Sequence, residues 1–345
     1  MEYRRFGNTG LKVSELSFGT ATFGGSNDFF KAWGNTQDNE AKRLVDICID
    51  QDINLFDTAN VYSDGLAESI LGKALGAKRK DIVLSTKATF PTGQGVNDYG
   101  SSAVHLMKAC DESLRRLGTD YIDVYHMHGF DANTPVEETL STLDRLIQSG
   151  KVRYIACSNF SGWHLMKSLS VSEKNSWSKY VVHQVYYSLL NREFEWELMP
   201  LGIDQNMGTM VWSPLSSGLL SGKYRREIQP ENGRIAEGGS PLKLNDTDKE
   251  RMYDIVDVLI KLSEELGKTP AQIAIRWLLQ RPTISNVIIG ARNEEQLVSN
   301  FGAVGWSLTL EQIKMLDKVS DVDPIYPYSH QKNFPMLNAV ADLYK

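Results

Sequence analysis

Four polar residues able to handle a proton follow three successive apolar runs of the sequence. Run 53–57 ends in Asp57 and leads to Tyr62, run 82–87 ends in Lys87, and run 121–126 leads to His128. A phenol with its ordinary pKa of about 10 is a poor acid at neutral pH, and a nearby ammonium favours the phenolate and lowers that pKa. These residue types therefore predict a general-acid site that protonates an oxygen as a hydride reaches the adjoining carbon.

Each member of the set also has an ordinary structural interpretation. Asp57 could cap a turn, Tyr62 could be a buried ring, and Lys87 could be a solvated charge. His126 and His128 would share one face of a strand and so raise the question of a metal. No other cysteine or carboxylate pattern supports a metal site, and we expect none. The hypothesis depends on the four residues converging at the ends of neighbouring strands.

Eight strand-like apolar runs recur along the chain, most of them starting thirty to forty residues apart. Near-continuous apolar runs are typical of parallel strands covered on both faces, and this spacing suits βα units. The pattern predicts a (β/α)8 TIM barrel, whose catalytic residues lie after the carboxyl ends of the strands. The predicted strands are 16–20, 53–57, 82–87, 121–126, 152–158, 180–185, 209–213 and 286–290.

Other segments complete this expected single domain of residues 1–345. Amphipathic helical patterns cover 40–51, 103–117, 137–148, 248–266 and 270–279. A hairpin over Tyr3–Val13 could close the bottom of the barrel, and the Gly-, Pro- and Ser-rich segment 216–243 is typical of a functional loop. The extended C-terminal tail, 323–345, follows neither a helical nor a strand pattern.

The composition narrows the function classes. The 345 residues carry a formal net charge of −6 with a pI near 5.6, which argues against a nucleic-acid partner. No stretch of about eighteen apolar residues predicts a membrane span, and the N-terminus shows no secretory signal. Three cysteines without a CxxC motif favour a reducing cytoplasm. The oligomeric state is not predicted.

Three motifs resemble the aldo-keto reductase superfamily: Asn54-Leu55-Phe56-Asp57-Thr58-Ala59-x-x-Tyr62, Ser85-Thr86-Lys87, and Tyr121-Ile122-Asp123-Val124-Tyr125-x-x-His128. The likeness runs from Gly10 to Gly302 and is greatest to the branch with potassium-channel β subunits and bacterial reductases. It implies a small-molecule carbonyl substrate, hydride from NADPH, and a catalytic tetrad of Asp57, Tyr62, Lys87 and His128, with Tyr62 as proton donor. The alternative is a regulatory or scaffold subunit that binds NADP(H) and senses redox state.

A dinucleotide must then bind without a Rossmann fingerprint, because Gly93, Gly95 and Gly100 have the wrong spacing for one. The resemblance implies that the nicotinamide carboxamide contacts Ser158, Asn159 and Gln184 and that its ring stacks on Trp212. The remaining cofactor candidates are Thr20, Ser213, Pro214, Leu215, Ser216, Lys223, Arg234, Gly290, Gln296 and Asn300.

Arg292 precedes a helix after the eighth strand, a position that often binds phosphate in barrels. Its planar guanidinium suits a 2′-phosphate and so favours NADPH over NADH, although pairing with Glu295 is an alternative.

Aromatic residues on the loops are candidates for the substrate pocket. Phe23, Trp33, Phe90 and Phe130 are expected at the catalytic face, and Tyr326 and Tyr328 of the tail could fold across its mouth. Each could instead serve only to pack its own loop.

Overall fold

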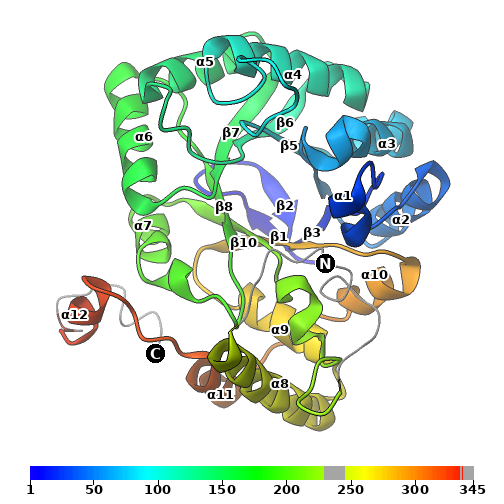
Figure 1. Cartoon of the computed structure of the whole chain (residues 1–345), viewed down its shortest axis with the longest axis vertical. Coiled ribbons are helices and arrows are strands. Elements are labelled where there is room, and N and C mark those ends of the chain that lie inside the picture. The colour runs from blue at the N-terminus through cyan, green and yellow to red at the C-terminus, as the bar shows by residue number, and fades with distance from the viewer. Residues whose placement is uncertain (229–244, 335, 337–345) are drawn as a thin grey trace.

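The computed structural model describes residues 1–228, 245–334 and 336 of the chain (Figure 1). Eight parallel strands close into a barrel in the order β10-β3-β4-β5-β6-β7-β8-β9, which confirms the predicted (β/α)8 fold. Every predicted strand is present, with boundaries within three residues. The strands are β3 (Leu16–Gly19), β4 (Leu55–Asp57), β5 (Val83–Ala88), β6 (Ile122–Met127), β7 (Val152–Ser158), β8 (Val182–Tyr186), β9 (Gly208–Trp212) and β10 (Ile284–Ile289).

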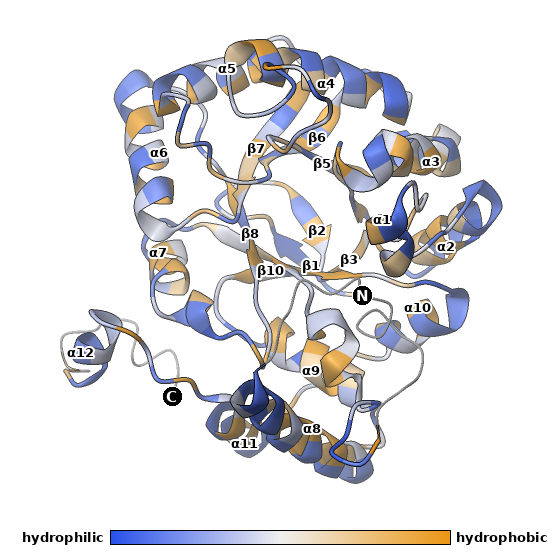
Figure 2. Cartoon of the chain, in the orientation of Figure 1, coloured by the Kyte–Doolittle hydropathy of each residue, from blue (hydrophilic) through white to orange (hydrophobic). Residues whose placement is uncertain are grey.

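Helices surround the barrel, and their apolar faces turn toward the strands while their polar faces turn outward (Figure 2). The predicted helices are present, and α9 begins at a capping box formed by Thr269 and Gln272. The helices are α1 (Asp28–Trp33), α2 (Asp38–Asp50), α3 (Leu66–Leu75), α4 (Ala103–Leu117), α5 (Val136–Gln148), α6 (Gly162–Asn175), α7 (Leu198–Asp204), α8 (Asp246–Leu266), α9 (Pro270–Leu279), α10 (Glu294–Phe301), α11 (Leu310–Ser320) and α12 (Tyr328–Lys332).

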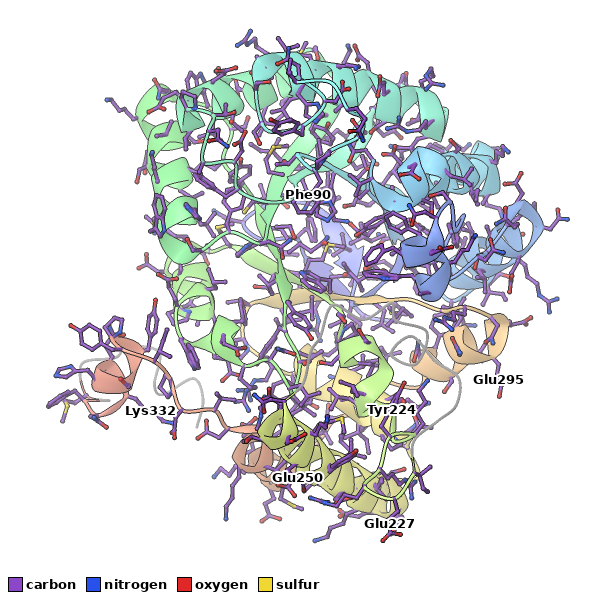
Figure 3. The ribbon with its side chains drawn as sticks, viewed as in Figure 1. Phe90, Tyr224, Glu227, Glu250, Glu295 and Lys332 are labelled. Atoms are coloured by element: carbon purple, nitrogen blue, oxygen red, sulfur yellow. The ribbon has the colours of Figure 1, made fainter. Side chains whose placement is uncertain are left out.

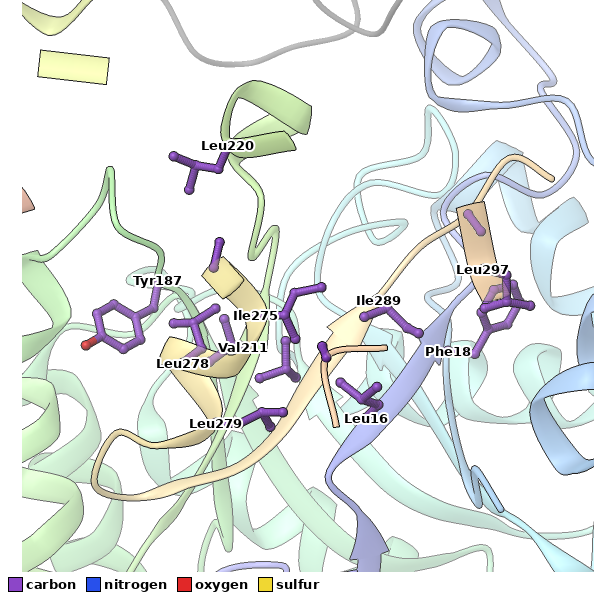
Figure 4. Packing of buried hydrophobic residues seen from close by; sticks show 14 of the residues in the cluster. Leu16, Phe18, Tyr187, Val211, Leu220, Ile275, Leu278, Leu279, Ile289 and Leu297 are labelled. Atoms are coloured by element: carbon purple, nitrogen blue, oxygen red, sulfur yellow. The ribbon is translucent and has the colours of Figure 1, made fainter. Parts of the chain in front are cut away.

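The main core lies between the strands and this helical layer. Figure 4 shows Leu16 of β3, Val211 of β9 and Ile289 of β10 packing near Ile275 and Leu278 of α9. All five side chains are buried. Burial of such side chains, at roughly 25 cal/mol per Å² of apolar surface, is the main term that holds the helices on the barrel.

A predicted hairpin closes the amino-terminal end of the barrel. Strands β1 (Tyr3–Arg5) and β2 (Lys12–Ser14) pair antiparallel, and the fully buried Phe6 joins a cluster of residues from the barrel strands. Gly7 has φ 62° and packs so closely that a Cβ would lie 2.1 Å from the Val181 carbonyl oxygen. Only glycine suits this turn, which holds the hairpin against the amino-terminal end of the barrel. A ligand can therefore enter only from the carboxyl end.

The tail departs from the prediction. Described residues 323–334 run past α11 to α12, which lies beside α7 and outside the ring of strands (Figure 1). The ring of Tyr328 lies 6.2 Å from that of Trp196, and Tyr326 is 81% exposed. The expectation that these two tyrosines cover the barrel mouth is therefore wrong.

Among the described residues, no helix is both long and apolar enough to cross a membrane.

Candidate active site

Neighbouring strands bring Asp57 and Lys87 together as a buried ion pair. Asp57 ends β4 and Lys87 lies near the end of β5, and Lys87 Nζ donates to Asp57 Oδ2 at 2.5 Å and to the Thr58 carbonyl at 2.8 Å. Lys87 is fully buried and Asp57 is 3% exposed. Burial alone would lower the pKa of Lys87, but the charge of Asp57 and the hydrogen bonds of Lys87 with Asp57 and Tyr62 raise it above its ordinary value. Lys87 is therefore a fixed ammonium.

Ser85 and Gln184 hold the other oxygen of this carboxylate. Ser85 pairs with Asp57 in the β4–β5 register, and its Oγ donates to Asp57 Oδ1 at 2.8 Å. Gln184 of β8 reaches across the barrel and donates from Nε2 to the same oxygen at 3.1 Å. Ser85 was not among the predicted site residues, although its position two residues before Lys87 on a strand places both on one face. Together these bonds fix the direction from which Asp57 meets Lys87.

Tyr62 lies directly after this pair, at the start of a short 3₁₀ turn (Tyr62–Gly65). Lys87 Nζ lies 5.1 Å from the centre of the Tyr62 ring. The next residue, Ser63, adopts φ 49° and is fastened by its hydroxyl, which donates to the Phe23 carbonyl at 2.7 Å. Backbone strain of this kind persists where surrounding contacts hold it, and here it aims the phenol into the barrel mouth.

The pKa of Tyr62 lies above its ordinary value, contrary to the sequence-based expectation. Burial raises this pKa most, and the charge of Asp57 adds to it, while Lys87 lowers it by its charge and hydrogen bonding. Lys87 thus acts in the expected direction but is outweighed by desolvation. The consequence is a phenol that keeps its proton through the neutral range.

His128 follows β6 and faces Tyr62 with a ring-centre separation of 5.8 Å. Its backbone is fixed on both sides, because its N–H donates to the Ala88 carbonyl and its carbonyl accepts from Asn159 Nδ2 at 2.9 Å. Burial, and then the charge of Lys87, hold the pKa of His128 well below its usual range. The imidazole is therefore neutral and offers one N–H donor.

A cavity of about 850 Å³ opens at this end of the barrel and brings together Asp57, Tyr62 and His128. Most of the predicted cofactor residues also line it: Thr20, Ser158, Asn159, Gln184, Trp212, Ser213, Pro214, Leu215, Lys223, Gly290, Arg292, Gln296 and Asn300. Ser216 does not, because it is buried and its hydroxyl bonds to that of Ser188 at 2.7 Å, while its neighbour Ser217 lines the cavity. Arg234 lies outside the described residues.

The walls of the cavity carry hydrogen-bonding groups and stacked rings. Trp212 stacks on Tyr186 with ring centres 4.4 Å apart, a partner that the sequence analysis missed. Arg292 donates to the carbonyl oxygens of Ala32 and Trp33, at 3.1 Å for the latter. Among the described residues, the side chains of Arg292 and Glu295 make no contact. The backbone carbonyls of α1, and not the alternative ion pair with Glu295, therefore hold the guanidinium.

Of the four loop aromatics predicted to line the substrate pocket, two line the cavity and two do not. Trp33 and Phe90 line the cavity, and Figure 3 shows Phe90 over the centre of the ring of strands. Phe23 is fully buried against Phe18, and Phe130 stacks on His164 at 3.7 Å, so the prediction that they line the substrate pocket is wrong. Lys332 on α12, also labelled in Figure 3, lies far to the side.

Comparison with known proteins gives a consistent result. The aldo/keto reductase family model matches residues 15–321. The chain is 37% identical over 330 residues to the uncharacterized oxidoreductase YrpG of Bacillus subtilis, covering 92% of this chain and 96% of that protein. It is 37% identical over 327 residues to a probable voltage-gated potassium channel subunit beta of Arabidopsis thaliana, covering 93% and 96%.

A third relative has a named reductase activity. The chain is 31% identical over 348 residues to versiconal hemiacetal acetate reductase of Aspergillus parasiticus, covering 95% of this chain and 99% of that protein. The closed barrel, the cavity at its carboxyl end and the match over nearly the whole chain agree. The chain therefore belongs to the aldo/keto reductase family and is an oxidoreductase.

Proposed function

We propose that the protein reduces an aldehyde or ketone to the alcohol with NADPH and that Tyr62 is the general acid. The observation that carries the proposal is the buried Lys87–Asp57 pair beside the Tyr62 ring, in reach of the cavity that His128 also lines. A buried ion pair is costly to desolvate and is weak evidence for stability alone. Its place at the catalytic end of a barrel favours a chemical role.

The residues of the cavity fit a dinucleotide that carries a central pyrophosphate and a 2′-phosphate. Lys223 and Arg292 supply positive charge on segments that follow β9 and β10. Ser158 and Asn159 offer hydroxyl and amide groups, and Trp212 offers an aromatic face. When bound, NADPH supplies the hydride. The planar fork of Arg292 supports NADPH over NADH, because it matches a 2′-phosphate in shape and charge.

The chain's own residues then handle the carbonyl oxygen and its proton. Neutral His128 donates a hydrogen bond that orients the carbonyl oxygen toward Tyr62. Tyr62 Oη gives up its proton as negative charge develops on that oxygen, and Lys87 stabilises the phenolate that remains. Asp57, held by Ser85 and Gln184, keeps Lys87 charged and directed at Tyr62.

The test is NADPH oxidation by the purified protein against a panel of aldehydes, ketones and sugars, with Tyr62→Phe beside it. Loss of the general acid should lower kcat by about 10²- to 10⁴-fold while NADPH still binds. Tyr125→Phe is the matched control, because that hydroxyl is buried in the helical layer and has no hydrogen-bond partner among the described residues. Equal loss of turnover and NADPH binding in Tyr62→Phe would count against Tyr62 as the acid.

A second candidate is a regulatory or scaffold subunit that binds NADP(H) and senses redox state. Two plant relatives and one from fission yeast, 35–37% identical to this chain, carry the name of voltage-gated potassium channel subunit beta in probable or putative form. Tight NADPH binding without turnover of any carbonyl would favour this candidate. Turnover that depends on Tyr62 would favour the reductase.

A cytoplasmic location is part of the proposal. All three cysteines of the sequence, Cys48, Cys110 and Cys157, are free and buried. Burial raises the pKa of each thiol, so none is poised as a reactive thiolate. Such cysteines serve as packing groups and suit a reducing compartment.

A further inference from the structure

Helix α1 places three aromatic side chains on the wall of the cavity, and the sequence analysis named only one of them. Phe29, Phe30 and Trp33 all line the cavity. The ring of Phe29 lies 5.3 Å from that of Phe30 and 5.6 Å from that of Trp33. Phe30 in turn lies 6.5 Å from Tyr62, edge to face. These separations are those at which aromatic rings attract one another.

A further aromatic ring lines the same cavity beside His128. Phe90 stacks on His128 with ring centres 4.4 Å apart and an angle of 29° between the planes. Rings therefore continue from α1 through Tyr62 and His128 to Phe90, and the two groups that would meet a carbonyl oxygen lie in the middle. Phe29 and Phe90 remain 52% and 40% exposed. Large exposed rings beside a cavity are typical of a surface that an apolar ligand covers.

Contacts at both ends hold α1 in this place. At its beginning, Ser26 donates to Asp64 at 2.5 Å, and the Gly25 N–H donates to Ser63 Oγ at 3.0 Å. At its end, Arg292 donates to the carbonyl oxygens of Ala32 and Trp33. The anchors include the turn that carries Tyr62, so the aromatic wall and the phenol are positioned together. A wall fixed before the ligand arrives loses less entropy on binding.

Among the described residues, the charges on the cavity wall are paired or lie toward the expected phosphates. Its charged lining residues within the described chain are Asp57, Lys223, Arg292 and Glu295. Asp57 is already paired with Lys87, and the other three follow β9 and β10, where the dinucleotide phosphates are expected. His128 is neutral. A carboxylate or phosphate beside the reacting carbonyl would lose its water and meet rings, and no described residue there offers it a dedicated cation.

Resting on the proposed function, we propose that the substrate is an uncharged aldehyde or ketone with an aromatic or otherwise planar conjugated group next to the carbonyl. The flat group lies between the α1 rings and Phe90, and the carbonyl oxygen points to Tyr62 and His128. Stacking and edge-to-face contacts then distinguish a planar ring from a saturated one of equal size.

The test compares benzaldehyde with cyclohexanecarboxaldehyde, which have the same number of carbon atoms, and with 4-carboxybenzaldehyde. We expect kcat/KM for benzaldehyde to exceed that for the carboxylate by about tenfold or more, the cost of desolvating an unpaired charge. Phe30→Leu should lower the ratio of kcat/KM for benzaldehyde to that for cyclohexanecarboxaldehyde by about two- to tenfold, the contribution of one aromatic contact. Phe130→Leu is the matched control, because Phe130 packs on His164 outside the cavity.

The outcomes separate a failure of the aromatic substrate class from a failure of the proposed reductase activity. An unchanged ratio in both Phe30→Leu and Phe90→Leu, or equal use of the neutral and charged aldehydes, would overturn the aromatic substrate class while leaving the reductase intact. The comparison of neutral and charged aldehydes needs only the unaltered protein, so a variant that fails to fold does not remove the test. No reduction of any carbonyl would overturn the reductase itself and the substrate class with it.

Discussion

Replacing Asp57 by asparagine tests whether the ion pair is what keeps Lys87 charged. The substitution removes the carboxylate charge from a lysine that is fully buried, leaving only uncharged groups beside it: the new amide, the Thr58 carbonyl and the phenol of Tyr62. Removing one partner of a buried pair typically costs about 3–5 kcal/mol of stability, because the other charge is left uncompensated. Lys87 can limit that cost by losing its proton. From an ordinary pKa of about 10.4, neutralising a lysine at pH 7 costs about 4.6 kcal/mol.

The cost of neutralising Lys87 falls as the pH rises, so the destabilisation caused by Asp57→Asn depends on pH. In Asp57→Asn a neutral Lys87 would have a folded-state pKa below its unfolded value, so the unfolded chain would bind more protons and stability would rise with pH. Between pH 7 and pH 9 the deficit against the unaltered protein should shrink by about 1 to 2.7 kcal/mol, because neutralising Lys87 costs about 1.9 kcal/mol at pH 9. In the unaltered protein the folded-state pKa of Lys87 is raised, and its contribution is fully present over this window.

The assay is urea unfolding at pH 7 and pH 9, with two further variants. Ser85→Ala removes one hydrogen bond to the charged Asp57 but no charge and should cost about 1.5–3 kcal/mol, independent of pH. Asp57→Asn combined with Lys87→Met removes both charges and should recover much of the lost stability, although not the activity. A loss of less than about 1 kcal/mol in Asp57→Asn at pH 7 would refute the argument that the pair compensates a buried charge.

Two further predictions concern activity. The pKa of Tyr62 is raised and that of His128 is far below its usual range. We therefore expect kcat/KM for carbonyl reduction to stay level from about pH 6 to pH 9 and to fall only as Tyr62 loses its proton above about pH 10. A fall near pH 7 would contradict both assignments. Arg292→Ala should weaken NADPH binding by about tenfold to a hundredfold, the range for a hydrogen-bonded charge, and NADH binding far less. It should also raise KM for the carbonyl, because Arg292 holds the end of α1; equal effects on the two cofactors in a binding titration would refute the 2′-phosphate role.

The barrel and its polar strand ends could be predicted because they depend on short-range pattern. Buried parallel strands are apolar nearly throughout, and the residue that follows each one must lie at the same end of the barrel. Asp57 and Lys87 therefore had to be neighbours once β4 and β5 were recognised. The observed β4 begins at Leu55, two residues later than predicted, since Asn54 instead bonds with its side chain to the Ser14 N–H and the Lys12 carbonyl.

The loops were less predictable because their contacts are distant in sequence. Helix α1 has six residues, too few for an apolar periodicity, and is fixed by Asp64 and Arg292 from other parts of the chain. Phe23 looked like a loop aromatic, but its isolated bridge with Thr36 turns it into the core. Nothing in the local sequence separates Phe23 from Phe30, of which only the second faces the cavity.

The same anchors link the two halves of the proposed site. Arg292 stands where the 2′-phosphate is expected and also holds the end of the helix that carries Phe29, Phe30 and Trp33. Ser63 and Asp64 hold the beginning of that helix from the turn that follows Tyr62. A displacement at either anchor must therefore move the aromatic wall relative to the phenol. Since a shift of about 1 Å can cost a hundredfold in rate, the choice of substrate depends on residues that never touch it.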